Sequence, residues 1–178
     1  ISLQDIPAFP FQDAQEVLTD LQQRIQTDFP PLDALTKTLP TCRTKAVAES
    51  MEEFTSPAFY LTPPIDDMGD NVIYVNNAST SPGLELYTTL AHEGYPGHLY
   101  QTVYSQLYEN SRTKNPVRSA LFYGGFVEGW AYYVENISYG YASDVLLANG
   151  ASNITPLLVD IACLERNLQV NLYCLLDL

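Results

Sequence analysis

The chain has 178 residues, of which 46% are hydrophobic and 12% aromatic, and its formal net charge is −13. This composition can form the core of one domain, residues 1–178, and it excludes a disordered or fibrous protein. Because so acidic a surface repels phosphate, we expect neither nucleic acid nor an anionic membrane as a partner.

The first predicted element is a helix that begins after Asp13. Asp13 is a typical N-cap, and Glu16 is placed to be its reciprocal partner. The inward face consists of apolar residues at helical spacing, which are Ala14, Val17, Leu18, Leu21 and Ile25. The segment Phe29-Pro30-Pro31 should end this helix.

A hairpin is predicted next in the chain. Residues 58–62 and 72–76 are rich in aromatic and β-branched side chains, and a long acidic loop separates them. The intervening region 32–54 is ambiguous, and Thr44 to Val47 is either a short strand or an irregular segment. The hairpin, in one interpretation, simply covers one side of the helices.

The second half of the chain predicts helices. One runs over residues 84–94 and, after a break, over residues 96–108, and another runs over residues 117–137. Residues 140–150 contain glycine at both ends and are expected to form a loop. The fold class is therefore mainly α, with a small β-hairpin or short antiparallel sheet beside the helices.

The last helix is predicted to begin at Thr155-Pro156. It carries a strongly apolar stripe, formed by Leu157, Ile161, Leu164, Leu168, Leu172 and Leu175. The chain begins without a methionine, and this stripe has no stop signal at Leu178. We therefore expect the chain to be an excerpt of a longer protein.

Cysteines and hydropathy say little about the compartment. Cys42, Cys163 and Cys174 are too few and too scattered for a disulfide framework, so we expect buried thiols. No apolar run reaches the ~18 residues of a membrane span, and Ile1 opens no signal-peptide pattern. The sequence leaves open the oligomeric state and the compartment, including secretion and the cell envelope.

Both histidines of the chain, His92 and His98, lie in one short segment with Glu93 beside the first. Two neutral imidazoles and a carboxylate are the groups that a catalytic zinc site uses. The histidines are six residues apart, however, which on an ideal helix places them roughly 120° apart around the axis. An unbroken helix therefore does not direct both rings at one ion.

The residues between the two histidines predict a break in the helix. Pro96 has no N–H to donate and its ring crowds the carbonyl four residues earlier. Gly94 and Gly97 permit backbone angles that other residues avoid. We expect the chain to kink here, which returns the second imidazole toward the first.

Three further glycines, Gly124, Gly125 and Gly129, lie in the predicted helix that carries Glu128. Each costs about 1 kcal/mol relative to alanine in a helix interior. We expect them to permit a close approach to the neighbouring helix, so that Glu128 reaches a metal held by that helix.

Two motifs carry a resemblance to a known family. The segment from His92 to His98 (HEGYPGH) with Gln101 after it, and Glu128-Gly129-Trp130-Ala131 with Tyr133 and Glu135 downstream, resemble the DUF885 family of zincin-like proteins. Further matches are Ser56-Pro57-Ala58-Phe59-Tyr60, Tyr74-Val75-Asn76 and Leu164-Glu165-Arg166. The similarity runs from about Cys42 to the end of the chain.

The resemblance implies a single zincin-like catalytic domain of the gluzincin type. In that arrangement His92, His98 and Glu128 bind Zn²⁺, and Glu93 is the general base that accepts a proton from the metal-activated water. Glu135 is on the same helix face as Glu128 and is either a rival ligand or a residue that supports a ligand.

Other residues are candidates for substrate or transition-state contacts. Gln101 is expected to lie beside the site and to bond a ligand or the substrate. Tyr95, Tyr132 and Tyr133 are near in sequence and are candidate donors to the oxyanion. In the family an Arg and a His follow the position of Asp177, so we expect this chain to bind metal and yet be a weak or inactive peptidase, whereas a longer chain would be active.

The predicted function is zinc-dependent hydrolysis of peptide bonds, with a peptide as substrate. The resemblance also implies that a strand of the hairpin pairs with an extended substrate. Two alternatives stay open: a metal- or peptide-binding helical module without catalysis, and a helical interaction domain in which the His-Glu-His grouping is incidental. The sequence does not distinguish endopeptidase from exopeptidase action.

Overall fold

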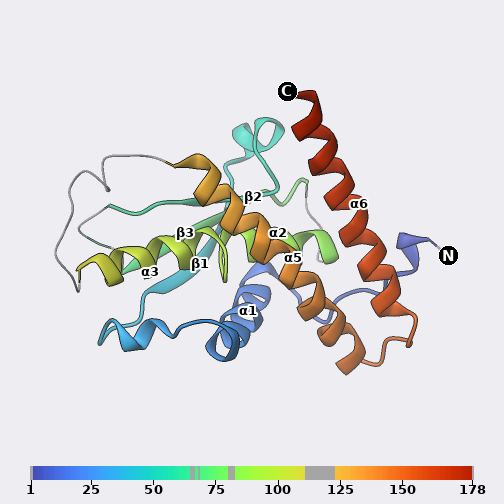
Figure 1. Ribbon diagram of the computed structural model, residues 1–178, viewed down its shortest axis with the longest axis horizontal. Coiled ribbons are helices and arrows are strands. Elements are labelled where there is room, and N and C mark those ends of the chain that lie inside the picture. The colour runs from blue at the N-terminus through green and yellow to red at the C-terminus, as the bar shows by residue number, and fades with distance from the viewer. Residues whose placement is uncertain (1, 65–66, 68, 80–82, 111–122, 178) are drawn as a thin grey trace.

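The computed structural model describes residues 2–64, 67, 69–79, 83–110 and 123–177. In these ranges the fold is mainly helical with a small sheet, as the sequence predicts. The helices are α1 (Ala14–Asp28), α2 (Leu84–Glu93), α3 (His98–Asn110), α5 (Gly124–Ala148) and α6 (Thr155–Leu176). The strands are β1 (Thr41–Ala46), β2 (Ala58–Leu61) and β3 (Asp70–Val75) (Figure 1).

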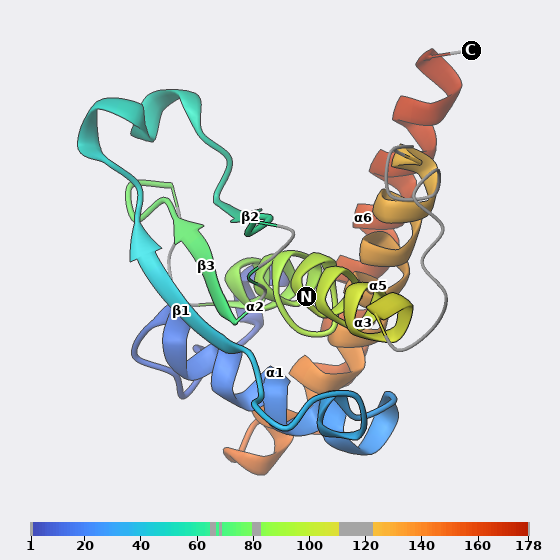
Figure 2. The ribbon, with the colours of Figure 1, turned by 90° about the vertical axis from the view of Figure 1, so that its left-hand side faces the viewer.

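The elements form three layers. In Figure 2 the strands lie on one side of α2 and α3, and α5 and α6 lie on the other side. Helix α2 packs against α1, α5 and β2, so it is the central element of the fold. Its residues Leu86, Tyr87, Leu90 and Ala91 are at most 3% exposed. The candidate site at the end of α2 is therefore built on the most buried helix.

Helix α1 forms as its sequence predicts. The Asp13 carboxylate accepts a hydrogen bond from the Glu16 N–H at 2.9 Å, and the Glu16 carboxylate accepts one from the Gln12 N–H at 2.7 Å. These contacts satisfy N–H groups that have no partner within the helix. The buried face comprises Val17, Leu18, Leu21 and Ile25, and α1 ends before Phe29.

The predicted hairpin is confirmed, since β2 and β3 pair antiparallel with Ala58 opposite Val75. The ambiguous region contributes a third strand, β1, which pairs parallel to β3 with Thr41 opposite Asp70. The sheet is therefore mixed, in the order β1-β3-β2, and β2 is an edge strand.

The predicted loop over residues 140–150 is wrong, because α5 continues to Ala148. Tyr141, Ala142, Val145 and Leu146 are buried at helical spacing in this stretch. Their burial outweighs the cost of Gly140 within the helix. The predicted start of this helix lies in residues 111–122, outside the described residues, and the described helix begins at Gly124.

The glycines of α5 were predicted to permit a close approach to the neighbouring helix, and this is wrong for two of them. A Cβ atom built on Gly125 or on Gly129 meets no heavy atom within 4 Å. These residues therefore do not permit a close approach between helices. Both lie on the exposed N-terminal half of α5.

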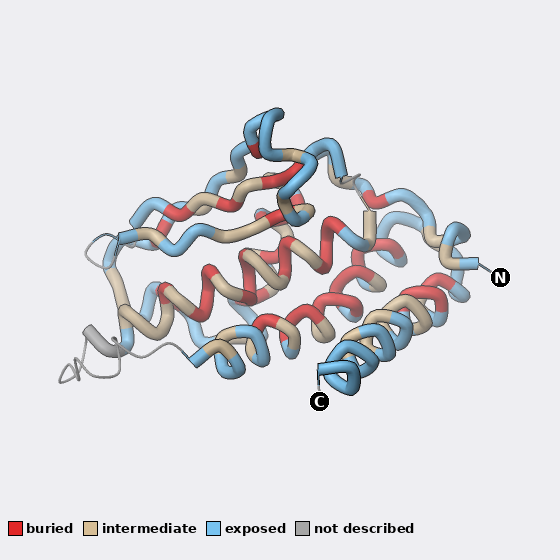
Figure 3. Tube along the Cα trace, turned by 90° about the horizontal axis from the view of Figure 1, so that it is seen from above, coloured by how far each residue is buried: buried red, intermediate tan, exposed pale blue. Residues whose placement is uncertain are grey.

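Helix α6 begins at Thr155 with Pro156 in its first turn, as predicted. Only its first part is buried, at Thr155, Leu158 and Val159, whereas most of the predicted apolar stripe is exposed (Figure 3). The cysteine prediction is wrong for Cys174, which is exposed, while Cys42 and Cys163 are half-buried. No helix in the described part of the chain has the length and hydrophobicity to cross a membrane.

Candidate metal centre

The break between α2 and α3 brings the two histidines together. Helix α2 ends at Glu93 and α3 begins at His98, and the peptide bond between Tyr95 and Pro96 is cis. The His92 and His98 ring centroids are 4.8 Å apart with their planes at 89°. The predicted kink, and its effect on the second imidazole, are therefore confirmed.

The glycines of this break are required for space. A Cβ at Gly97 would lie 1.7 Å from the backbone oxygen of His92, and a Cβ at Gly94 would lie 2.6 Å from Cδ2 of Leu18. The unusual backbone angles expected from the sequence occur at Gly94, with φ −107° and ψ −106°, although among the described glycines only Gly150 has a positive φ. The loop is folded so tightly against α2 that no side chain fits at either position.

A tryptophan of α5 secures the same loop from outside. The Trp130 indole Nε1–H donates to the backbone oxygen of Pro96 at 2.9 Å. Its ring also stacks near Tyr100 of α3, with centroids 6.4 Å apart. The Glu-Gly-Trp motif of α5 thus fixes the loop between the histidines through Trp130 and presents Glu128 two residues earlier.

The Glu128 carboxylate completes a group of three donor atoms. Its Oε2 lies 3.7 Å from Nε2 of His92 and 3.6 Å from Nε2 of His98. In a tetrahedral zinc site, bonds of about 2.0–2.1 Å separate neighbouring ligand atoms by about 3.3–3.4 Å. The two separations measured from Glu128 are close to these values.

Glu93 is adjacent to this group and is held by the sheet. Its Oε2 accepts a hydrogen bond from the backbone N–H of Tyr60 in β2 at 2.9 Å, and its Oε1 lies 4.0 Å from Nε2 of His92. Burial raises the pKa of Glu93, although the Tyr60 N–H acts in the opposite direction. His92, Glu93 and His98 also offer ligand atoms within 4.8 Å of one another, so Glu93 is the rival to Glu128 as third ligand.

Glu135 holds the far side of the His92 ring. Its Oε2 lies 2.9 Å from Nδ1 of His92, and its Oε1 accepts a hydrogen bond from Nε of Arg166 in α6 at 2.9 Å. A carboxylate on Nδ1 fixes the ring and leaves Nε2 available to a metal. The sequence left Glu135 open as ligand or support, and the geometry favours support.

The two imidazoles have opposite electrostatic surroundings. Burial disfavours the charge on His92, but the hydrogen bond to Glu135 and the nearby carboxylates outweigh it and raise the pKa of His92. Burial and the neighbouring His92 together lower the pKa of His98. These surroundings favour the neutral form of His98, which is the form that binds a metal.

The residues predicted to contact the substrate or the oxyanion differ in their surroundings. Gln101 is buried and donates from Nε2 to the backbone oxygen of Phe126 at 3.4 Å, so it links α3 to α5 near Glu128. Tyr95 is buried, and its hydroxyl has no partner among the described residues. The Tyr132 hydroxyl donates to Asn167 of α6, and Tyr133 is exposed with its ring near Trp130.

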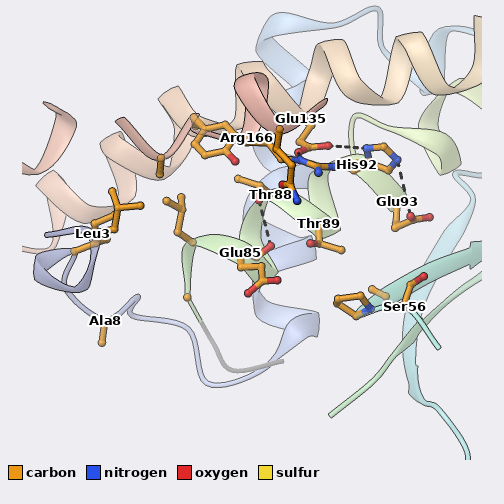
Figure 4. A pocket seen from close by; sticks show the side chains of 18 of the residues that line it. Leu3, Ala8, Ser56, Glu85, Thr88, Thr89, His92, Glu93, Glu135 and Arg166 are labelled. Carbon is orange, nitrogen blue, oxygen red and sulfur yellow. Dashed lines mark hydrogen bonds and ion pairs between the residues drawn. The ribbon is translucent and has the colours of Figure 1, made fainter. Parts of the chain in front are cut away.

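A cleft of about 800 Å³ opens beside His92 and Glu93 (Figure 4). It is lined by α2, the start of β2, the N-terminal segment, α6, and Glu135 and Tyr139 of α5. Sequence reasoning gave no role in the site to Arg166, which lines this cleft. Arg166 is the only basic residue of α6, an otherwise largely apolar helix, and this isolation could have indicated a function.

The fold and the site together define a mainly helical domain with a His-Glu cluster at a break between two helices. The family model described as "Bacterial protein of unknown function (DUF885)" matches residues 2–151, and the chain belongs to this family. The match begins well before Cys42, the residue from which the resemblance to the family was recognised in the sequence. It ends before α6.

Comparison with solved structures gives a match to a protein described as a "putative lipoprotein" from Colwellia psychrerythraea. The sequence identity is 21% and the TM-score is 0.49, and the match covers 86% of this chain and 25% of that one. The chain thus spans about a quarter of the length of that protein. A search of curated proteins finds no match.

Proposed function

We propose that this protein hydrolyses peptide bonds with a zinc ion bound by His92, His98 and Glu128. The observation that carries the proposal is the convergence of two imidazole nitrogens and one carboxylate oxygen, at 3.6 and 3.7 Å, with a second carboxylate beside them. Two histidines and one glutamate are a ligand set of catalytic zinc sites, which keep a further position open.

The roles of the residues follow from this arrangement. A zinc ion bound there supplies a Lewis acid, which polarises the substrate carbonyl and lowers the pKa of a water to about 7. Glu93 accepts a proton as the water oxygen adds to the carbonyl carbon, and it returns that proton to the amine nitrogen as the C–N bond breaks. The Tyr60 N–H fixes one Glu93 oxygen, so the other oxygen faces the histidines.

The edge strand β2 favours a peptide as the substrate. Because the Tyr60 N–H points to Glu93 rather than to β3, the outer edge of β2 faces the site. Alternation along an antiparallel strand directs the backbone groups of Ala58 to the same edge. An extended peptide can therefore add to β2 by strand pairing, with its backbone beside Glu93.

A peptidase assay on the zinc-loaded protein tests this proposal. Mass spectrometry of a peptide mixture should detect cleavage, and Glu93→Gln should reduce the rate by about 100-fold or more while zinc content is unchanged. Glu165→Gln, at an exposed position of α6, is the matched control and should keep the rate. No cleavage by the native protein would favour a non-catalytic metal- or peptide-binding module, and loss of zinc from Glu93→Gln would make Glu93 a ligand.

A further inference from the structure

The described lining of the cleft runs from the proposed catalytic residues to the N-terminal segment. In Figure 4 the labelled residues form a row, with His92, Glu93 and Ser56 toward one end and Leu3 and Ala8 at the other. Leu3 belongs to a short 3-10 helix, Leu3–Asp5, that contacts α6. The N-terminal segment therefore forms the far end of the cleft.

The direction of β2 indicates which part of a bound peptide enters this cleft. Tyr60 is level with Glu93, whereas Ser56, Pro57 and Ala58, which precede it, line the cleft. A peptide that pairs antiparallel with β2, the more stable arrangement, runs in the opposite direction. Its residues on the C-terminal side of the cleaved bond then lie beside Ser56 to Ala58 and continue into the cleft.

Among the described residues that line this cleft, Arg166 is the one with a permanent positive charge. Its Nε donates to Glu135, and its Nη1 and Nη2 atoms make no hydrogen bond to any described residue. The side chain is 39% exposed, and it lines the cleft. The charge of Glu135 is shared with His92, and the other acidic residues of the lining are Glu85 and Glu93.

We propose that Arg166 binds the C-terminal carboxylate of the substrate, which would make this protein an exopeptidase that acts at the C-terminus of peptides. A guanidinium presents two N–H groups that match a carboxylate, and such charge-assisted hydrogen bonds are the stronger ones. The cleavage step rests on the proposed function, but recognition of the carboxylate does not require a metal. Leu3, Ile6 and Leu84 also line the cleft, and they favour an apolar C-terminal residue.

The competing explanation is that Arg166 only positions Glu135. A pair of peptides separates the two roles: a pentapeptide ending in leucine, with either a free carboxylate or a C-terminal amide. Loss of a purely positioning residue changes the affinity for both peptides alike. Loss of a carboxylate-binding residue changes the affinity for the free acid, so the ratio of the two affinities is the decisive quantity.

The experiment measures both dissociation constants by calorimetry, on metal-free and on zinc-loaded protein. We expect the free acid to bind about 10-fold or more tightly than the amide without metal, and Arg166→Gln to abolish this preference. Lys45→Gln removes a positive charge from exposed β1, outside the cleft, and should retain the preference. Equal affinities in the native protein, including undetectable binding of both peptides, or a preference that survives Arg166→Gln, would overturn the proposal. Because the metal-free measurement involves no hydrolysis, it fails or succeeds independently of the proposed function.

Discussion

The two sides of the candidate metal centre differ in how they are held. On the α2–α3 side, the side chains of His92, Glu93 and His98 are 14–18% exposed and are fixed by a loop with no spare space. On the α5 side, Glu128 is 65% exposed. Two of the three proposed ligands are thus oriented by packing before a metal binds, whereas the third is free to adjust.

This difference indicates which substitutions affect folding and which affect only metal binding. A buried, fully packed segment transmits any change of volume to its neighbours. Substitution of an exposed side chain on one helix face usually changes the stability of the fold little. Substitutions on the α2–α3 side should therefore lower both folding stability and metal binding. Substitution of Glu128 on the α5 side should lower metal binding alone.

The largest effect is expected from Gly97→Ala. Its methyl group would lie 1.7 Å from a backbone oxygen of α2, so the loop must move, at a cost of about 3 kcal/mol or more in unfolding free energy. Chemical denaturation measures this loss. Gly140→Ala is the matched control, because its Cβ meets nothing within 4 Å, and it should stabilise the protein by about 1 kcal/mol. Equal stability of the two variants would show that the loop is not tightly packed.

Removal of the Glu135 carboxylate that supports His92 should have an intermediate effect, which is on zinc affinity. Glu135→Gln replaces the carboxylate that contacts Nδ1 of His92 and Nε of Arg166. We expect zinc affinity to fall by about 10- to 100-fold, since a residue that orients a ligand typically contributes that much. A competition titration with a chelator of known affinity gives the value, and an unchanged affinity would show that Glu135 has no influence on the metal.

The smallest effect on folding is expected at the exposed ligand. Glu128→Ala should leave the unfolding free energy of the metal-free protein within about 0.5 kcal/mol of the native value, because the side chain is largely exposed. His98→Ala, with a side chain that is 14% exposed, should destabilise the metal-free protein more. Denaturation of both variants in the presence of a chelator tests the contrast. A larger loss for Glu128→Ala would reverse the comparison between the two sides.

Local chemistry predicted part of this centre. Pro96, Gly94 and Gly97 predict the break between α2 and α3. The absence of the proline N–H and of the glycine side chains affects the backbone within a few residues, so it can be recognised from the local sequence. The length of α5 was not predictable in this way, because Gly140 indicates a loop and only the burial of Tyr141 and Val145 against other elements keeps the helix intact.

The contacts between distant segments required the structure. Glu128 was assigned to the histidines through the family resemblance, because its position depends on how α5 packs on α2, which no sequence interval specifies. The proposed role of Arg166 depends on a cleft that five separate segments line. The exposed stripe of α6 likewise shows that apolar periodicity predicts a helix without predicting what covers it.

Elemental analysis of the purified protein measures whether His92, His98 and Glu128 hold a zinc ion. We expect about one zinc ion per chain in the native protein, and loss of most of it in His92→Ala and in His98→Ala, because catalytic sites need three protein ligands. Glu165→Gln, at an exposed position of α6, should retain full occupancy. Absence of zinc from native protein after reconstitution, or full occupancy in either histidine variant, would contradict the assignment of this site.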